Sequence, residues 1–244
     1  MSEWDASEMA DRRSEIEYVG SGRHRHRCAF TLIELLVVIG LIAALVAVVA
    51  VGLRPAGQGV ALQAGQSAVA NLLNAARLNA LATGRETRVL LCVETASAAD
   101  DFLRRLAWQE KTDQRWITQG EIRLPDGVAM LPRNPEAFTG LLTPGVAWTR
   151  EDGAALRSTA FRAGADVRAA VNSPGAVDWA AVTFSSAGTT MGSGDLVLGA
   201  TVIRPPSDRG AGEAPVRFVH PDQVRGLSVS GYGLATLVNS REGF

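Results

Sequence analysis

The chain has 244 residues, and its 24 Lys and Arg side chains nearly balance 25 Asp and Glu side chains, for a formal net charge of −1. This balance argues against a nucleic-acid-binding protein, because contacts with phosphates depend on clustered Lys and Arg. The neighbouring Arg104 and Arg105 are expected on the solvated face of a strand. The length is sufficient for one compact domain with its own hydrophobic core.

A polar N-terminal segment, residues 1–29, precedes a long apolar run at residues 30–53. At helical rise this run is long enough to cross a hydrocarbon core of roughly 30 Å. Arg23, Arg25 and Arg27 crowd its N-terminal side, whereas a single arginine follows it. The positive-inside rule therefore predicts a cytoplasmic leader, expected to be disordered, and an exported body.

One carboxylate, Glu34, interrupts the start of the apolar run, and no ionisable side chain occurs at residues 35–53. A charged group in lipid costs about 2.5 to 3.5 kcal/mol on insertion scales, so Glu34 is expected to have a partner. If the chain is cut between Ala29 and Phe30, the new α-amino group lies one helical turn from Glu34. That amino group, in the same subunit or in a neighbour, is a candidate partner.

Ala29 followed by Phe30-Thr-Leu-Ile-Glu34-Leu resembles the leader junction of the type IV pilin and pseudopilin family. The resemblance implies that a prepilin peptidase removes residues 1–29 and methylates the new terminus at Phe30. It also implies that Glu34 sets the register of assembly. The chain departs from the family at Ala29, where glycine is usual. A conventional secretory signal has a shorter apolar segment, and a simple signal anchor gives no reason for Glu34.

Beyond the apolar run, residues 54–84 are predicted to return to helix. Pro55, Gly57 and Gly59 form a cluster at which the helix is expected to kink or briefly unwind. Apolar residues then recur every three or four positions at Val69, Leu72, Leu73, Ala76 and Ala80, with Gln66, Asn71, Asn74 and Arg77 toward the other side. Gly84 is a suitable C-cap, so the apolar face is expected to pack on a sheet.

The remainder, residues 85–244, is predicted to be a β-rich head, which makes the fold class α+β with a long N-terminal helix on an antiparallel sheet. Residues 134–174 and 204–215 are rich in Pro, Gly, Ala and Asp and are expected to be loop insertions. The predicted strands are 87–94, 103–108, 116–122, 179–184, 195–203, 216–219, 227–229 and 234–238.

Later segments resemble one subgroup of the family, the H-type pseudopilins of type II secretion and the FimT-like minor pilins. These segments are the passage from residue 74 to 91 and two strand-turn elements at 182–188 and 227–237. The second element departs from the family's usual Gly-Arg-Val ending, because Gly233 is followed by Leu and Ala. Residues 108–172 have no counterpart in the resemblance.

No catalytic constellation is evident, and no metal or cofactor is expected. After removal of the leader, His220 is the only histidine and Cys92 the only cysteine, so neither a histidine metal cluster nor an internal disulfide is available. Cys92 lies in an apolar strand pattern and is interpreted as a buried structural residue. Asp100-Asp101 and Glu151-Asp152 are interpreted as exposed turns. An enzyme is therefore not expected.

The sequence predicts a pilin-like subunit of a type II secretion pseudopilus in the inner membrane, with its N-terminus cytoplasmic and its head periplasmic. The resemblance implies as partners the prepilin peptidase, other pseudopilins or pilins, and an assembly platform with its cytoplasmic ATPase. Two alternatives stay open. One is a minor type IV pilin for pilus priming, adhesion or DNA uptake, and the other is a signal-anchored periplasmic protein.

Overall fold

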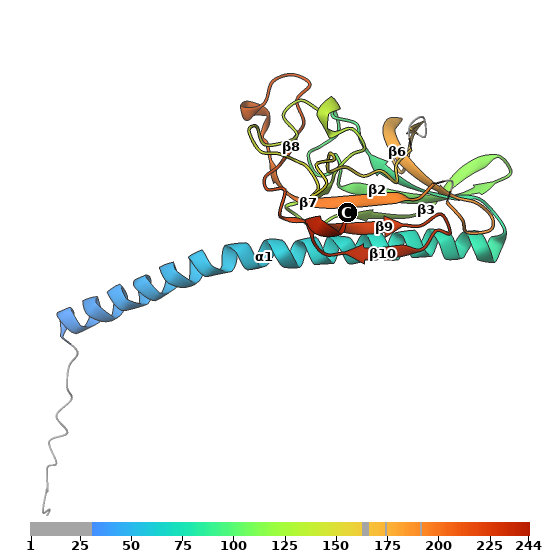
Figure 1. Cartoon of the computed structure of the whole chain (residues 1–244). Helices are drawn as coiled ribbons and strands as arrows, with labels where there is room; N and C mark the ends of the chain where they lie inside the picture. The colour runs from blue at the N-terminus through green and yellow to red at the C-terminus, as the bar shows by residue number, and fades with distance from the viewer. Residues whose placement is uncertain (1–30, 163–165, 174, 191) are drawn as a thin grey trace, which may run out of the picture. The chain divides into compact units, whose positions relative to one another are not determined.

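The computed structural model describes residues 31–162, 166–173, 175–190 and 192–244, and side chains 47–56 lie outside the description. The chain divides into two units, Met1–Val48 and Val49–Phe244. The long helix α1 (Leu32–Thr83) contributes to both, and every strand belongs to the second unit, which we call the head. Figure 1 shows the strands of the head gathered over the C-terminal half of α1.

Helix α1 continues without interruption through Pro55, Gly57 and Gly59, so the expected unwinding at this cluster is wrong. A proline inside a helix costs about 3 kcal/mol and a glycine about 1 kcal/mol. The apolar and alanine-rich residues on both sides have high helix propensity, and their contribution offsets the cost of the proline and the glycines. The helix ends as predicted, because Gly84 has φ +67° and its N–H donates to the Ala80 carbonyl at 2.9 Å.

The face of α1 that packs on the head follows the predicted spacing of three and four residues. Its buried apolar members are Leu62, Val69, Leu72, Leu73, Ala76 and Ala80. Gln66 was expected on the polar side of the helix, but it is only 2% exposed. Its amide Nε2 donates to the carbonyl oxygens of Gly226 at 2.7 Å and Val238 at 2.8 Å. These bonds satisfy the buried amide and explain why a polar residue occupies the apolar face.

The ten strands of the described chain form two antiparallel sheets, which confirms the α+β fold class. The first sheet has the order β3-β2-β1-β6-β5, with β1 (Thr87–Cys92) paired to β2 on one side and to β6 on the other. Its other strands are β2 (Arg105–Thr112), β3 (Arg115–Arg123), β5 (Val167–Ala169) and β6 (Val177–Phe184). A bulge lies between Trp108 and Gln109 where β2 pairs with β3.

The second sheet has the order β10-β9-β7-β4, and β8 pairs with the C-terminal end of β7. Its strands are β4 (Val128–Met130), β7 (Gly194–Ile203), β8 (Val216–Phe218), β9 (Val224–Val229) and β10 (Ala235–Val238). Three short 3-10 turns lie at Pro135–Ala137, Pro206–Asp208 and Arg241–Gly243. The three-residue strands β4 and β5 were not predicted from the sequence.

The main hydrophobic core lies between α1 and the two sheets, and a smaller core covers the opposite face of the first sheet. The smaller core contains Trp179 and Leu90, and Val171 packs with them. Residues 134–174, expected to be loops, supply β5 and also several buried side chains. These are Leu141, Trp148, Leu156, Phe161 and Val171. The segment is therefore part of the packed head.

Arg104 and Arg105 are buried, so the expectation that they lie on a solvated strand face is wrong. Arg104 donates to the Leu124 carbonyl at 3.1 Å and to two carboxylates, whereas Arg105 donates to both carboxylate oxygens of Glu121 at 2.6 and 3.0 Å. Arg105 also donates to the Val171 carbonyl at 2.7 Å. Both guanidinium groups are buried because acceptors from distant segments surround them.

Candidate functional site

The first described turn of α1 contains Thr31 and Glu34. Thr31 is the N-cap of the helix, and its Oγ1 accepts the N–H of Glu34 at 3.3 Å. The spacing Thr-x-x-Glu is the sequence signature of a capping box. Thr31 received no role from the sequence, although this spacing could have identified it. The carboxylate lies in the first turn, where the helix dipole favours a negative charge.

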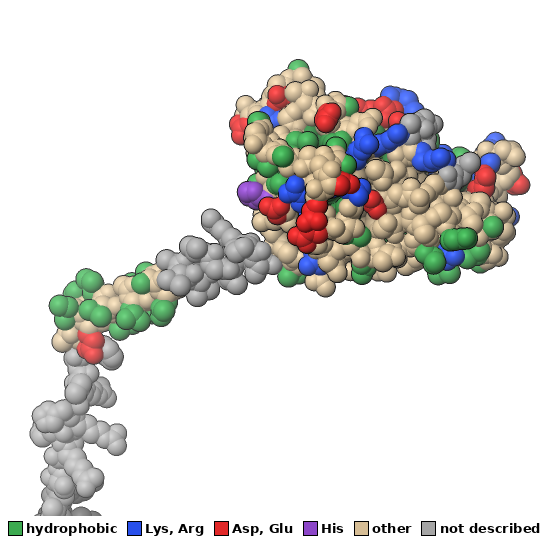
Figure 2. Space-filling model, in the orientation of Figure 1, with side chains coloured by type: hydrophobic (Ala, Val, Ile, Leu, Met, Phe, Trp, Pro, Cys, Tyr) green, Lys and Arg blue, Asp and Glu red, His purple; other side chains and the backbone are tan. Residues whose placement is uncertain are grey.

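Residues 32–46 form a helical surface whose side chains are all exposed in the single chain. Large apolar side chains cover this segment in Figure 2, and their exposed fractions range from 46% at Val38 to 81% at Leu32. A helix that is apolar on every side is ordinarily buried against lipid or protein. Among the described residues, no helix combines the length and the apolar character that a membrane span requires.

The predicted processing residues Ala29 and Phe30 lie outside the described residues, as do Arg23, Arg25 and Arg27. Cleavage, methylation and the charge of the leader stay predictions. Glu34 is described and exposed, and its proposed role in assembly register is likewise a prediction.

At its C-terminal end α1 joins the two strand-turn elements in which the sequence resembles one pilin subgroup. The Nε of Arg77 donates to the carbonyl oxygens of Gly188 and Tyr232, both at 3.1 Å. Thr190 joins the same turns, because its N–H donates to the Gly231 carbonyl at 3.1 Å. The segments that carry the subgroup resemblance therefore meet in one contact. Large exposed apolar residues on these segments are Leu78, Leu81, Tyr232, Leu234 and Leu237.

The cysteine and the paired aspartates that the sequence analysis considered are held by packing or by ion pairs within the head. Cys92 is buried in β1, and burial raises the pKa of its thiol, so it matches the interpretation of a structural strand residue. Asp100 binds the guanidinium of Arg104 at 2.9 Å, and Asp101 binds that of Arg123 at 2.7 Å. Within the described ranges, no three His, Cys, Asp or Glu side chains are placed to hold a metal ion.

Comparison with known proteins identifies one family model, described as the prokaryotic N-terminal methylation motif, at residues 24–50. No curated protein matches the chain. The head and helix have the architecture of an α+β protein in which an N-terminal helix packs on antiparallel sheets. The matched segment contains Glu34 and the predicted junction between Ala29 and Phe30, in agreement with the N-terminal motif on which the resemblance to type IV pilins and pseudopilins rests.

Several solved structures are similar to the chain. The type IV minor pilin FimU of Pseudomonas aeruginosa is 10% identical with a TM-score of 0.35, and the match covers 72% of this chain and 87% of FimU. Two structures of the minor pseudopilin EpsH from the type II secretion system of Vibrio cholerae are 16% and 13% identical, with TM-scores of 0.36 and 0.35. They cover 73% of this chain and 95% and 96% of EpsH.

Proposed function

We propose that the chain is a structural subunit of a type II secretion pseudopilus, cleaved between Ala29 and Phe30 and assembled through its N-terminal helix. The observation that carries this proposal is the methylation motif at residues 24–50, because it overlaps a helix whose apolar side chains at 32–46 are not covered by any residue that the structure describes. Lipid before assembly, and the helices of other subunits after it, would provide that cover.

The capped first turn of α1 gives the proposed assembly step a physical basis. Thr31 fixes the start of the helix at Leu32, so that a terminus created at Phe30 would lie just before the first turn. Glu34 would then present its carboxylate to the α-amino group of an adjoining subunit. The charge pair would remove the cost of an isolated carboxylate in an apolar environment and would fix the axial register.

The proposed partners follow from this role: a prepilin peptidase, other pseudopilins, and an inner-membrane assembly platform with its ATPase. The subunit would be single-pass, with its N-terminus cytoplasmic and its head periplasmic before assembly. The proposed role is mechanical, so no catalytic residue or cofactor is assigned.

Mass spectrometry of the chain purified from membranes tests the processing step. We expect an N-terminal N-methylphenylalanine at Phe30, and Ala29→Gly should be processed at least as well as the parent. A bulky substitution at Ala29 should block cleavage, because the peptidase must accommodate a small residue there. An intact Met1, or a terminus beyond residue 50, would remove the proposal.

Deletion of the gene tests which system the subunit serves. Loss of secretion of folded proteins with unchanged surface piliation would support a pseudopilus. The opposite result would support the alternative, a minor type IV pilin. The segments at residues 74–91, 182–188 and 227–237 resemble both H-type pseudopilins and FimT-like minor pilins, so this deletion experiment is the one that separates the two roles.

A further inference from the structure

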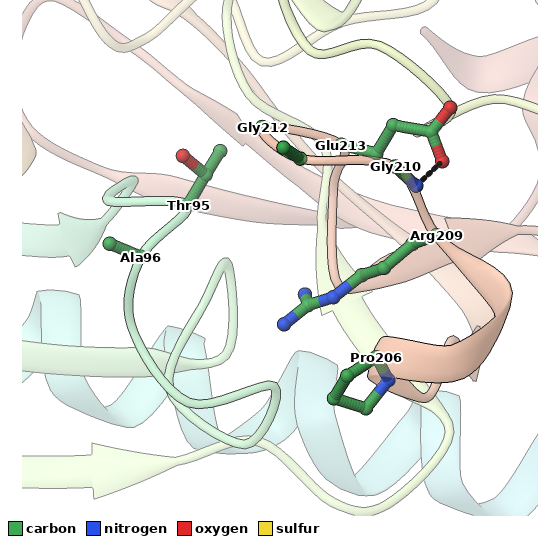
Figure 3. A pocket seen from close by; sticks show the side chains of 8 residues that line it. Thr95, Ala96, Pro206, Arg209, Gly210, Gly212 and Glu213 are labelled. Atoms are coloured by element: carbon green, nitrogen blue, oxygen red, sulfur yellow. Dashed lines mark hydrogen bonds between the residues drawn. The ribbon is translucent and has the colours of Figure 1, made fainter.

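A cavity of about 340 Å³ opens between the loop after β1 and the loop between β7 and β8, and Figure 3 shows its lining. Its carboxylate, Glu213, already accepts hydrogen bonds from Arg204 at 2.6 Å and from the backbone N–H of Gly210 at 3.1 Å. Most of the remaining lining is backbone and small side chains. This cavity therefore does not indicate a ligand, and the feature that does lies on the first sheet.

Three arginines are buried among the described residues, and one of them has no counter-charge. Arg104 and Arg105 each bind a carboxylate at 2.6 Å. Arg88, on β1, is only 8% exposed, yet no carboxylate that the structure describes forms an ion pair with it. Burial without such a pair lowers the pKa of Arg88 to about 10. The folded head thus carries the cost of an uncompensated charge.

The guanidinium of Arg88 keeps hydrogen-bond donors free. Its Nε donates to Oε1 of Gln109 at 2.8 Å, whereas its two terminal nitrogens have no acceptor among the described residues and neither of them is enclosed. The group lies over the ring of Trp116, with 4.1 Å between Cζ and the ring centroid. Stacking uses the flat face of a guanidinium and leaves its in-plane N–H groups for an acceptor. The acceptor is therefore expected to approach from outside the chain.

Arg88 lies on an open part of the outer face of the first sheet. Strand alternation places it on the same face as Leu90, which the smaller core covers. Arg88 is outside that core, and its neighbour Trp116 is half-buried. The other cation beside Trp116, Lys111, is already paired with Glu86 at 2.7 Å. The surroundings of Trp116 therefore carry one uncompensated positive charge, which suits a single carboxylate better than a polyanion.

The strand that carries Trp116 is a free edge. Strand β3 ends the order of the first sheet and pairs with β2 alone among the described strands. Each of its nine residues is at least partly exposed, whereas the strand at the other edge, β5, has three residues. Residues 115–118 pair regularly with β2 on the hairpin side of the bulge. The unpaired N–H and C=O groups of such an edge are a template for an added strand.

We propose that an extended segment of a partner protein pairs with the free edge of β3 and places a glutamate carboxylate on the guanidinium of Arg88. A guanidinium and a carboxylate form paired, charge-assisted hydrogen bonds. Arg88 already reaches the side chain of Trp116 on β3, so an acidic side chain directed back over β3 from the added strand meets it. A free small acid would gain one contact on an open face, whereas a protein segment also gains the backbone bonds of the edge.

The test uses the full chain in detergent, labelled with ¹⁵N, and two blocked peptides of threonine and valine with a central glutamate or glutamine. Binding is followed from the indole N–H signal of Trp116, which is assigned by its loss in Trp116→Phe. The chain has five tryptophans, so the other indole signals report binding elsewhere. The glutamate peptide should shift the Trp116 signal, and the glutamine peptide should bind about tenfold more weakly or worse.

Two variants remove the free charge in different ways. Arg88→Gln should weaken binding of the glutamate peptide about tenfold or more, and Arg157→Gln is the control, since Arg157 is exposed and outside both sheets. Gln109→Glu keeps nearly the same shape and places a carboxylate beside Arg88 within the chain. It should raise the melting temperature and weaken peptide binding to a similar degree. Gln63→Glu, at an exposed position of α1, should do neither.

Equal binding of the two peptides would overturn the proposal, as would undiminished binding by Gln109→Glu. The Gln109→Glu result decides the matter even if Arg88→Gln fails to fold. A glutamate peptide with N-methylated backbone amides should fail to bind, and equal binding would refute pairing with the edge. Displacement of the peptide by acetate or by a short single-stranded oligonucleotide at a lower concentration would refute a protein partner. Each of these results leaves the proposed filament role untouched.

Discussion

Gln66 is the polar residue on which the packing of α1 against the second sheet depends most directly. Its amide donates to Gly226 on β9 at 2.7 Å and to Val238 at the end of β10 at 2.8 Å. Gln66→Leu keeps the approximate volume of the side chain and removes both donors. The substitution therefore separates the hydrogen bonds from the packing.

The size of the effect follows from the number of bonds and their burial. Each net hydrogen bond contributes about 0.5 to 1.5 kcal/mol, and a carbonyl left without a partner costs about 1 to 3 kcal/mol. We expect Gln66→Leu to lower the free energy of unfolding by about 2 to 4 kcal/mol. For a head of this size the melting temperature should fall by roughly 5 to 15 °C.

The assay is urea denaturation of the fragment Val60–Phe244, followed by circular dichroism and tryptophan fluorescence. The fragment is expected to be soluble and to give a mixed helix and sheet spectrum, because it holds both sheets and the packed face of α1. Gln63→Leu is the control, since Gln63 is the same residue type on the same helix but exposed. It should change the free energy of unfolding by less than about 0.5 kcal/mol.

A loss of under 1 kcal/mol for Gln66→Leu would refute the importance of the two bonds. Gln66→Glu supplies a second check, because an ionised carboxylate would face two carbonyl oxygens and its pKa would rise in the folded state. A raised folded pKa adds stability below the ordinary glutamate pKa of about 4.3, and this stability is lost as pH rises through the folded value. Gln66→Glu should therefore be less destabilising at pH 4 than at pH 7.

Gly226→Ala should be strongly destabilising, by about 2 kcal/mol or more in denaturation, because the new Cβ would overlap the backbone oxygen of the adjoining strand β7. Arg105 lowers the pKa of Glu121 by hydrogen bonding, so this carboxylate stabilises the fold above the ordinary glutamate pKa and loses that effect on acidification. Glu121→Gln should flatten the fall in stability between about pH 5 and 3. Glu34→Leu should leave membrane insertion intact and abolish filament incorporation, measured by crosslinking.

Each of these outcomes has a control or a contradicting result. Gly231→Ala should be nearly neutral, since its Cβ would meet no atom within 4 Å, and an equal loss at both glycines would contradict the steric argument. An unchanged acid profile for Glu121→Gln would show that its pair with Arg105 is not a source of pH dependence. Incorporation of Glu34→Leu at the parental level would exclude a charge pair as the guide to docking.

Periodic patterns in the sequence predicted the elements that repeat over several turns or residues. The spacing of Val69, Leu72, Leu73, Ala76 and Ala80 identified the buried face of α1, and alternation identified most strands. The strands β4 and β5 were missed although β8, of the same length, was predicted, because three residues are too few for alternation to identify a strand consistently.

Polar residues whose partners lie far along the chain could not be placed from local patterns. Gln66 bonds to Gly226 across 160 residues, and Arg105 bonds to Val171 across 66 residues. Their local sequences are compatible with exposure, and only the tertiary fold brings the acceptors close.

The N-terminal motif could be recognised from the sequence because its signals are local. The motif around Glu34 is a contiguous run of residues, and the cap at Thr31 follows from a spacing of three. The expected interruption at Pro55 failed for the opposite reason. Proline and glycine usually interrupt a helix, but at Pro55 the helix-forming residues on both sides keep the chain helical.

The bonds that fix α1 on the head also constrain when the head can form. Gln66 lies 172 residues before its acceptor at Val238, and Arg77 lies 155 residues before Tyr232. Closing loops of this length is slow. A chain that emerges from its N-terminus therefore presents the apolar face of α1 long before β9 and β10 have been synthesised. Until the last strand arrives this face is an aggregation hazard, which makes the nascent subunit a natural client for chaperones.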